Sequence, residues 1–520
     1  MQQNTGKKNN VKVWATVIIL LALLSAAGWI VSRSFVIFLD SASGMKFYSV
    51  KSRVINLSDT TYEDYTQLTR CTGLDILDVR GCPGFTAEQY DVLAQSNRSC
   101  EILWEIPVEG KLYSSTTETL KLTAPTEADC AMLSYFPNMK HIDATACAPN
   151  DAIVAACREL GDVKWSFSLG SRQVTTDDAA LDLQGMNLED DAQLAFILSC
   201  VPKIKYAELT DCGLSPQQLV ALREQFPEAG ARWNFDFYGK PAESDMEQID
   251  ISGITVTDLD QFRERMKNFS SIKKVVMCGC GLDNETMAAL NSEYPDTQLV
   301  WRVYLGPWSL RTDAKSFCTN IGVDNAYRLT DSDIKPLQYC TDLEHLDIGH
   351  SGVRDLSPIA GLTKMKTLIV VDSVRSISDL SALKDMKHLQ YLEIFVNSIS
   401  DISVLADKKE LLDLNIKYNR IADITPLLGL KQLERCWMGG NPVSQKDRAR
   451  LEEAIPMCDF NYDFGESTDN WRTNHRFFQM REYFGYDMTV RRAHLGIVCP
   501  YDELPENYIT HCNDKYSAAE

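Results

Sequence analysis

Hydrophobic residues in the C-terminal part of this 520-residue chain recur at a fixed interval. Five units begin with leucine or methionine, 22 residues apart with one step of 24, and further apolar residues alternate with polar ones behind each start. Such alternation predicts a short strand with its apolar side facing the core. Units this short cannot bury a hydrophobic face alone, so they must stack on one another. The starts are Leu343, Met365, Leu389, Leu411 and Leu433.

Two polar features complete each unit. A small polar residue follows each start by eight positions, where a buried amide or hydroxyl can hydrogen-bond the backbone as it leaves the strand. An Asp-[Ile/Leu]-[Ser/Thr]-x-[Leu/Ile] phrase comes next, as at residues 355–359, and its hydroxyl and following proline suit the start of a helical segment. Each unit therefore predicts a strand, a turn and a short helical segment. The predicted ladder is Ser351, Ser373, Asn397, Asn419 and Asn441.

This pattern resembles the leucine-rich-repeat family motif L-x-x-L-x-L-x-x-N-x-[IL], and the Asp-containing phrase is similar to the 22-residue, internalin-like subclass. The resemblance covers residues 331–459, and residues 440–456 are similar to the cap that ends such arrays. It implies an α/β repeat solenoid, a horseshoe with parallel strands on its concave face. It also implies that this concave face binds a protein ligand.

The N-terminal half has a longer period of about 68 residues. Four tryptophans each open an alternating segment, an apolar position follows each by 16 residues, and a third strand signal ends in a cysteine. Three strand-bearing coils per superunit are expected, loosely similar to ribonuclease-inhibitor repeats, with an unrelated α/β repeat as the alternative. The tryptophans are Trp104, Trp165, Trp233 and Trp301, and the cysteines, which take the ladder position of the later asparagines, are Cys82, Cys147, Cys212 and Cys280.

These periodic cysteines are expected to be buried thiols that pack as small hydrophobes. A disulfide ladder is the alternative, and it is less favoured because neighbouring members of the register are separated by whole coils. Cys499 and Cys512 lie outside the repeats and are the best disulfide candidates in an exported protein.

An apolar run near the N-terminus, residues 13–32, is long enough to span a bilayer as a helix. Lysines precede it, so the positive-inside rule predicts a single-pass signal anchor at the cell membrane, a cytoplasmic N-terminus and exported repeats. Cleavage as a signal peptide near residues 25–27 is the alternative. The expected layout is a cytoplasmic segment 1–12, the anchor 13–32, a linker 33–50, divergent repeats 51–320, internalin-like repeats with their cap 321–464, and an aromatic and basic tail 465–520.

Composition narrows the function. The formal net charge is −20, so most of the surface would repel nucleic acid. No nucleophile elbow, phosphate-binding glycine loop or zinc-binding His-Glu-x-x-His motif occurs, and nothing points to a catalytic residue, a metal or a cofactor. The favoured function is a surface-exposed protein-binding module. The alternatives are a structural envelope protein and, least favoured, an enzyme with an unfamiliar site.

The expected contact residues are the outward positions of the 22-residue units. Large apolar side chains there would form a contiguous patch, which soluble surfaces seldom keep without a partner. The alternative is that the tail from Gly465 covers the patch. The candidate ligand-binding residues are Ile369, Val371, Phe395, Tyr418 and Trp437.

Overall fold

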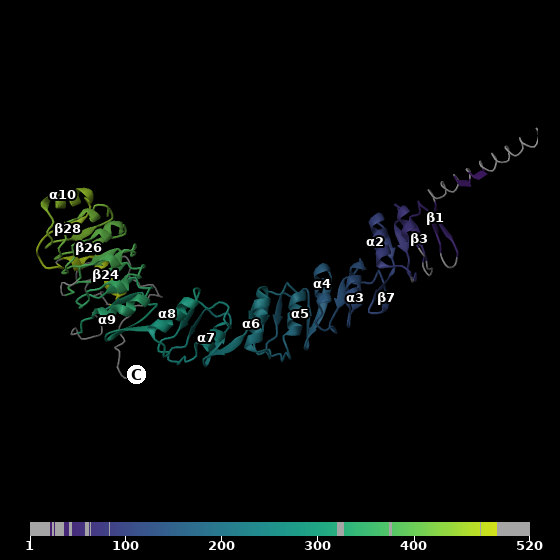
Figure 1. The fold of residues 1–520 in the computed structure, drawn as a ribbon, viewed down its shortest axis with the longest axis horizontal. Coiled ribbons are helices and arrows are strands. Elements are labelled where there is room, and N and C mark those ends of the chain that lie inside the picture. The colour runs from purple at the N-terminus through teal and green to yellow at the C-terminus, as the bar shows by residue number, and fades with distance from the viewer. Residues whose placement is uncertain are drawn as a thin grey trace, which may run out of the picture. The chain divides into compact units, whose positions relative to one another are not determined.

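The computed structural model describes residues 36–485, apart from 41–43, 58–61, 63, 83, 320–326, 374–376 and 469, together with residues 21, 22, 25 and 26. Two compact units, Met1–Phe235 and Asp236–Glu520, make up the chain, so the division falls within the predicted divergent repeats (Figure 1). Among the described residues, no helix is long and apolar enough to cross a membrane. Most of the predicted anchor, 13–32, lies outside them.

Short parallel strands in groups of three recur through the divergent repeats, each pairing with the next in sequence order. In the predicted linker 33–50, β1 (Val36–Leu39) and β2 (Lys46–Ser49) instead form an antiparallel pair. The parallel strands of the first unit are β3 (Val54–Asn56), β4 (Ile76–Asp78), β5 (Glu101–Leu103), β8 (Thr119–Lys121), β9 (His141–Asp143), β10 (Lys164–Leu169), β12 (Ala180–Asp182), β13 (Tyr206–Glu208) and β14 (Ala231–Arg232), and the second unit adds β17 (Gln248–Asp250), β18 (Lys274–Val276) and β19 (Gln298–Val300).

An antiparallel hairpin follows each group. The Trp165 segment also pairs in parallel with the preceding strand, as expected, whereas the other three tryptophan segments pair only within their hairpins, which corrects their assignment to parallel coils. The alternation after each tryptophan forms the first hairpin arm. At Glu109–Gly110 and Tyr238–Gly239 both turn residues have positive φ, as two-residue hairpin turns require. The hairpins are β6 (Glu105–Val108) with β7 (Lys111–Ser114), β10 with β11 (Arg172–Thr175), β15 (Asn234–Phe237) with β16 (Lys240–Glu243), and β20 (Arg302–Leu305) with β21 (Trp308–Arg311).

Helices connect the strands, and several begin with capping boxes that satisfy their free N–H groups, as at Thr86, Thr126 and Ser215. The helical segments of the divergent repeats are η1 (Thr66–Arg70), α2 (Ala87–Ser96), α3 (Glu127–Met132), η2 (Leu133–Tyr135), α4 (Asp151–Glu159), α5 (Ala192–Cys200), α6 (Pro216–Gln225), η3 (Pro227–Ala229), α7 (Leu259–Met266) and α8 (Asn284–Glu293), and α9 (Asp331–Ile334) with η4 (Lys335–Tyr339) leads into the shorter repeats.

A seven-stranded parallel sheet, in sequence order, contains the 22-residue repeats. Its register places Leu346, Leu368, Leu392, Leu414 and Cys436 side by side, all fully buried, as the apolar alternation predicts. The sheet begins before the predicted boundary at residue 321. Its strands are β22 (Ser316–Cys318), β23 (His345–Asp347), β24 (Thr367–Ile369), β25 (Tyr391–Glu393), β26 (Asp413–Asn415), β27 (Arg435–Trp437) and β28 (Asp459–Asn461).

The predicted helical segments of these repeats are 3-10 turns, and their capping group differs from the prediction. Asp355 Oδ1 accepts a hydrogen bond of 2.8 Å from the Ser357 amide, and the Ser357 hydroxyl donates back to Asp355 Oδ2. The aspartate, not the hydroxyl, therefore caps the turn. These turns are η5 (Ser357–Ile359), η6 (Ser381–Leu383), η7 (Ser403–Asp407) and η8 (Thr425–Leu427), and the array ends with α10 (Gln445–Ala454).

Ladder side chains lie where each strand ends. Asn419 Nδ2 donates to the carbonyls of Ile394 and Ile416 at 2.9 and 3.1 Å, and Asn397 and Asn441 make the equivalent bonds. In the divergent repeats, Cys82 Sγ lies 3.0 Å from the Leu57 carbonyl. Cys147, Cys212 and Cys280 are also buried, and every cysteine in the described part of the chain is a free thiol. Cys499 and Cys512 lie outside the described residues.

Candidate functional site

One face of the seven-stranded sheet is formed by side chains that point away from the repeat core. In each three-residue strand the middle residue is buried in the core, so both of its neighbours point to the opposite face. We call this surface the tail face. It carries two columns, His345, Thr367, Tyr391, Asp413, Arg435 and Asp347, Ile369, Glu393, Asn415, Trp437.

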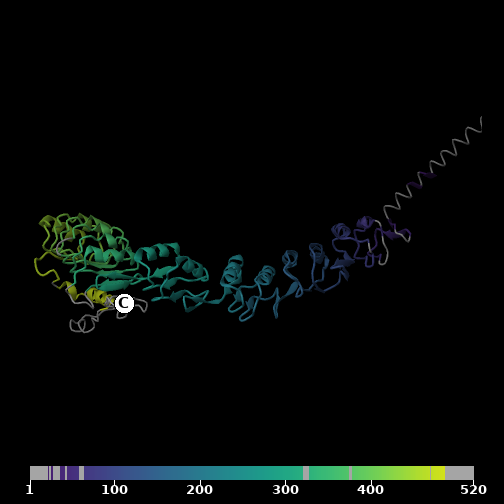
Figure 2. The same cartoon turned by 60° about the horizontal axis from the view of Figure 1, so that its bottom comes forward.

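A C-terminal segment, residues 464–485, covers the tail face, and we call it the docked tail. It contains η9 (Trp471–Thr473) and α11 (His475–Tyr483), drawn in yellow beside the green strands in Figure 2. Its Trp471, Phe477, Phe478, Met480 and Phe484 form one hydrophobic cluster with residues of the sheet. In this structure the docked tail, and no external partner, therefore buries the apolar side chains of the tail face.

This arrangement corrects the expected exposure of the candidate contact residues. Ile369, Val371, Phe395 and Trp437 are each no more than 4% exposed. Tyr418 is half-buried, and its hydroxyl donates to the carbonyls of Phe464 and Gly465 at 2.5 and 2.6 Å. The prediction that these side chains form an exposed patch is thus wrong. The tail covers them, as the alternative predicted.

Three arginines of the docked tail meet three buried carboxylates of the tail face. Arg481 Nη1 lies 2.9 Å from Asp347 Oδ2, and Arg472 Nη2 lies 3.2 Å from Glu393 Oε2. Arg476 pairs through Nε with Asp413 and through Nη2 with Glu434, the latter at 2.6 Å. Burying a carboxylate costs several kcal/mol unless a partner compensates it, so these arginines make the acidic face stable.

Trp471 is the central anchor of the docked tail. Its ring is fully buried, with ring centres 5.2 Å from Trp437 and 5.7 Å from Tyr391. The indole N–H donates to Glu393 Oε1 at 2.8 Å, and the Arg435 guanidinium lies 4.2 Å from the ring centre, where a cation is attracted to the π face. Arg435 also donates to the Trp471 carbonyl at 2.9 Å.

Glu393 collects donors from both the sheet and the tail. The Tyr391 hydroxyl, the Trp471 indole and Arg472 all donate to its carboxylate. Burial and the neighbouring Glu393 charge raise the pKa of Tyr391 well above its usual value, so the phenol keeps its proton and remains a donor. The carboxylate is therefore fully coordinated only while the tail is docked.

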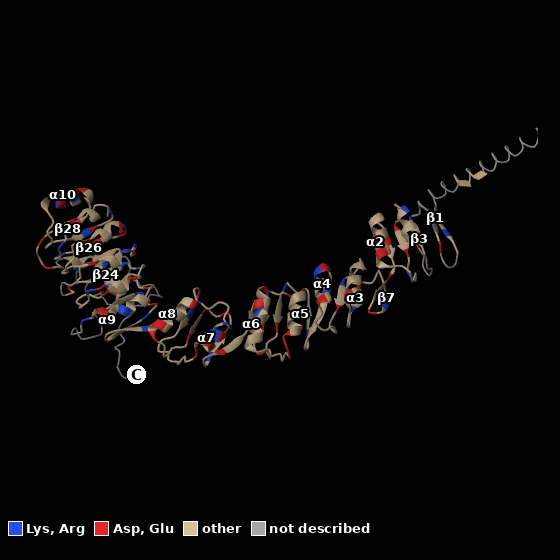
Figure 3. Cartoon of the chain, in the orientation of Figure 1, with Lys and Arg blue, Asp and Glu red and all other residues tan. Residues whose placement is uncertain are grey.

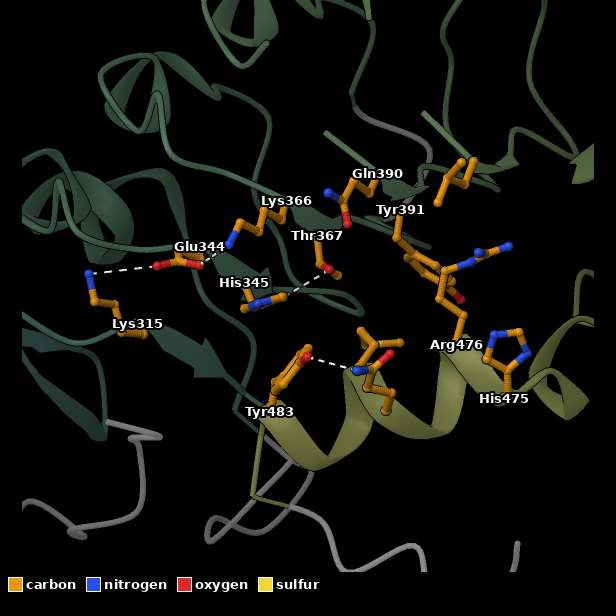
Figure 4. A pocket seen from close by; sticks show the side chains of 13 residues that line it. Lys315, Glu344, His345, Lys366, Thr367, Gln390, Tyr391, His475, Arg476 and Tyr483 are labelled. Atoms are coloured by element: carbon orange, nitrogen blue, oxygen red, sulfur yellow. Dashed lines mark hydrogen bonds and ion pairs between the residues drawn. The ribbon is translucent and has the colours of Figure 1, made fainter. Parts of the chain in front are cut away.

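A pocket of about 760 Å³, partly open to solvent, lies between α11 and the strand edge (Figure 4). Glu344 bridges Lys366 at 2.6 Å and Lys315 at 3.7 Å along one wall. His345 shares a hydrogen bond of 2.9 Å with Thr367, and burial lowers the pKa of His345 to about 3, so its ring is neutral near pH 7. On the helix side the wall is His475, Arg476, Gln479, Met480 and Tyr483.

Two parts of this site escaped the sequence pattern. The motif indicates the outward columns that begin at Asp347 and Gly349, but not the column that begins at His345, which strand geometry places on the same face. The counter-charges were also missed, because Arg472, Arg476 and Arg481 lie outside the repeat period. A usable signal was present, since the sheet offers Arg435 to one of three outward carboxylates and any segment that buries the other two must bring cations. No group of three or more potential metal-ligating side chains occurs in the part of the chain that the structure describes.

The 22-residue strand register and the asparagine ladder resemble those of internalin-like leucine-rich repeats. Solved structures matching most of this chain include an internalin from Listeria monocytogenes, with 18% identity, coverage of 81% of this chain and 90% of the internalin, and a TM-score of 0.26. A leucine-rich-repeat protein from Leptospira interrogans is 12% identical, with coverage of 79% and 96% and a TM-score of 0.24.

The Arabidopsis receptor kinase HAESA, solved with a peptide hormone and a co-receptor, is 10% identical, covers 75% of this chain and 38% of its own, and has a TM-score of 0.19. At these TM-scores the likeness carries no argument, and the repeat character rests on this chain's own strands. No family model and no curated protein matches the sequence.

Proposed function

We propose that this chain is a protein-recognition repeat protein whose tail face is the binding surface. The supporting observation is that this face already holds a polypeptide, the docked tail, through a buried tryptophan and three arginines. Tryptophan and arginine in desolvated positions are the side chains that dominate binding energy in protein interfaces. Ile369, Val371, Phe395, Tyr418 and Trp437 are the proposed apolar floor of the site.

The proposal includes export and attachment to the cell membrane. Its support is the apolar run 13–32 and the lysines before it, Lys7, Lys8 and Lys12. Protease added to intact cells should digest the repeats while the N-terminal fragment stays in the membrane fraction. Repeats that remain intact under these conditions would exclude external exposure.

Recognition can be tested with the full chain. A site-specific protease sequence is inserted after Phe464, which is exposed, and the folded protein is cleaved there. A labelled peptide of residues 465–485 should then exchange into the tail face and bind saturably. The control is the same peptide with Arg472→Glu, Arg476→Glu and Arg481→Glu, which should not bind because like charges meet. Absence of saturable binding to the cleaved protein would refute the proposal.

A further inference from the structure

We infer that the docked tail is an exchangeable internal ligand, and that the tail face accepts in its place a helical segment of another protein with the same tryptophan and arginine pattern. This inference rests on the proposed function, because it assumes that the face recognises polypeptides. It adds the chemistry of the partner and a means of regulating access to the face.

The partner chemistry follows from the contacts of the docked tail. Tryptophan and arginine stand next to each other before the helix, at 471 and 472, and two more arginines follow at 476 and 481. They meet carboxylates on β25, β26 and β23, so the partner must present guanidinium groups across several strands. Arg476 binds two carboxylates through different nitrogens, which a planar guanidinium does and a lysine ammonium does not.

The contact of α11 with the sheet is incomplete. A pocket of about 760 Å³, partly open to solvent, remains between α11 and the strands. Its sheet-side wall is polar, with Lys315, Glu344, Lys366 and Gln390. A partner helix with polar side chains at these positions would make contacts that the tail does not make. Such a helix would fill space that the tail leaves open.

The buried ion pairs between the docked tail and the tail face also favour selective recognition over mere shielding of the sheet from water. Replacing a buried ion pair by apolar residues of similar volume is often neutral or stabilising. A segment that only covered the sheet would need neither Glu393 nor Asp413 beneath it, and both carboxylates are fully buried. Their presence selects a segment that carries arginine.

Tethering explains how the tail can compete. A segment joined by a short linker acts at an effective concentration of roughly 1 mM, so it occupies its site unless an external ligand binds more tightly or is abundant. The tail follows β28 by only a few residues. An external peptide of the same sequence should therefore bind the intact chain at least about tenfold more weakly than a chain with a weakened tail.

The test uses the full chain and a fluorescent peptide of residues 465–485 as the probe. Three proteins are compared: the natural chain, a tail variant with Arg472→Glu, Arg476→Glu and Arg481→Glu, and a charge-matched control with Arg98→Glu, Arg354→Glu and Arg420→Glu. The control arginines are exposed and lie outside the tail. The tail variant should bind the probe at least about tenfold more tightly than the other two proteins.

Each outcome decides a different point. Equal binding to all three proteins would overturn the internal-ligand inference while leaving recognition by the face intact. Failure of every protein to bind, with strands β23–β27 still protected in hydrogen exchange, would overturn the proposed function itself. If the tail variant loses that protection, Trp471→Ala replaces it, because it weakens docking without changing the charge. The same gain in probe affinity is expected there, and its absence would overturn the inference.

Discussion

The strand faces of the N-terminal repeats and of the seven-stranded sheet both carry carboxylates, but they obtain their counter-charges differently. In the first unit Asp78 pairs with Arg80, two residues away, and Glu208 on β13 pairs with Arg232 on the adjacent β14. In the second unit Asp347 pairs with Arg481, 134 residues later in the chain. Figure 3 shows acidic and basic residues interspersed along both units.

Exposure separates the two faces further. The Asp78 and Arg80 side chains are 11% and 45% exposed, so water screens part of their charge. Glu393 and Asp413 have no exposed side-chain surface, and the arginines beside Asp413 are 11% and 17% exposed. These carboxylates of the first unit thus find their partners within their own repeats. The tail face takes Arg435 from the sheet itself and three further arginines from the docked tail.

The largest expected effect tests this dependence. Asp413→Asn keeps the size of the side chain but leaves Arg435 and Arg476 without their buried carboxylate. Losing one partner of a buried pair typically costs about 3–5 kcal/mol, so hydrogen exchange of α11 and β26 should show local opening that is easier by that amount. Asp78→Asn is the matched change on the other face, and it should cost less, because the Arg80 side chain is 45% exposed and water screens the pair.

Equal losses of stability from Asp413→Asn and Asp78→Asn would refute the difference between the two faces. A small effect at Asp413 would mean that water reaches the pair and that the tail does not seal the face. A large effect at Asp78 would mean that the N-terminal face also relies on a buried pair.

Much of the repeat fold was predictable because period and strand geometry are local. The 22-residue spacing predicted each strand that contains Leu346, Leu368, Leu392 and Leu414. Three of the four tryptophan segments were misassigned, since alternation alone does not distinguish a hairpin arm from a parallel strand; the Trp165 strand is both. A hairpin signal was available in the glycines five or six residues after each tryptophan, such as Gly110 and Gly239, which adopt positive φ in the turns.

The site was predictable only in part. The outward direction of Ile369 and Trp437 followed from strand alternation, but their burial depends on a segment with no periodic relation to the repeats. Contacts such as Trp471 to Glu393 join residues 78 positions apart, and no local pattern encodes them. Charge complementarity between outward carboxylates and tail arginines was the one global signal that pointed to the docking.

The second prediction, of intermediate size, compares the asparagine ladder of the seven-stranded sheet with the cysteine ladder of the divergent repeats. Asn419→Ala leaves the buried Ile399 amide without its acceptor and removes one of the two asparagine donors to each of the Ile394 and Ile416 carbonyls. An unsatisfied buried group costs about 1–3 kcal/mol and each further lost hydrogen bond about 0.5–1.5 kcal/mol, so the seven-stranded sheet should lose about 2 kcal/mol or more in urea unfolding. Cys212→Ala removes one buried sulfur and should cost only about 1–2 kcal/mol in its own sheet.

The two ladder variants are followed by hydrogen exchange in their own sheets, so that each loss is read locally. A larger loss for Cys212→Ala than for Asn419→Ala would show that the thiols stabilise the divergent repeats through more than packing. Mass spectrometry should also find Cys147, Cys212 and Cys280 unmodified by alkylating reagents until the protein is denatured, because burial raises the pKa of each thiol.

The smallest expected effect is a pH dependence of tail docking through His345. Its ring contacts Tyr483 of the tail, with ring centres 4.5 Å apart, and burial lowers its pKa to about 3 while the tail is docked. Release of the tail exposes the ring and returns its pKa to about 6.5. The released state therefore binds the extra proton between these pKa values, so acid favours release and docking is fully stable only above about pH 6.5.

Lowering the pH from 7.5 to 5.5 should thus weaken docking by about 1.4 kcal/mol, or roughly tenfold in the docking equilibrium. Hydrogen exchange of α11 at the two pH values, corrected for the intrinsic exchange rate, measures this change. His345→Gln should remove it, since glutamine does not titrate and can still hydrogen-bond Thr367. His141→Gln, at a half-buried histidine in the first unit, is the matched control and should leave it unchanged. If the natural chain and His345→Gln respond equally to acid, His345 does not cause the pH dependence of tail docking.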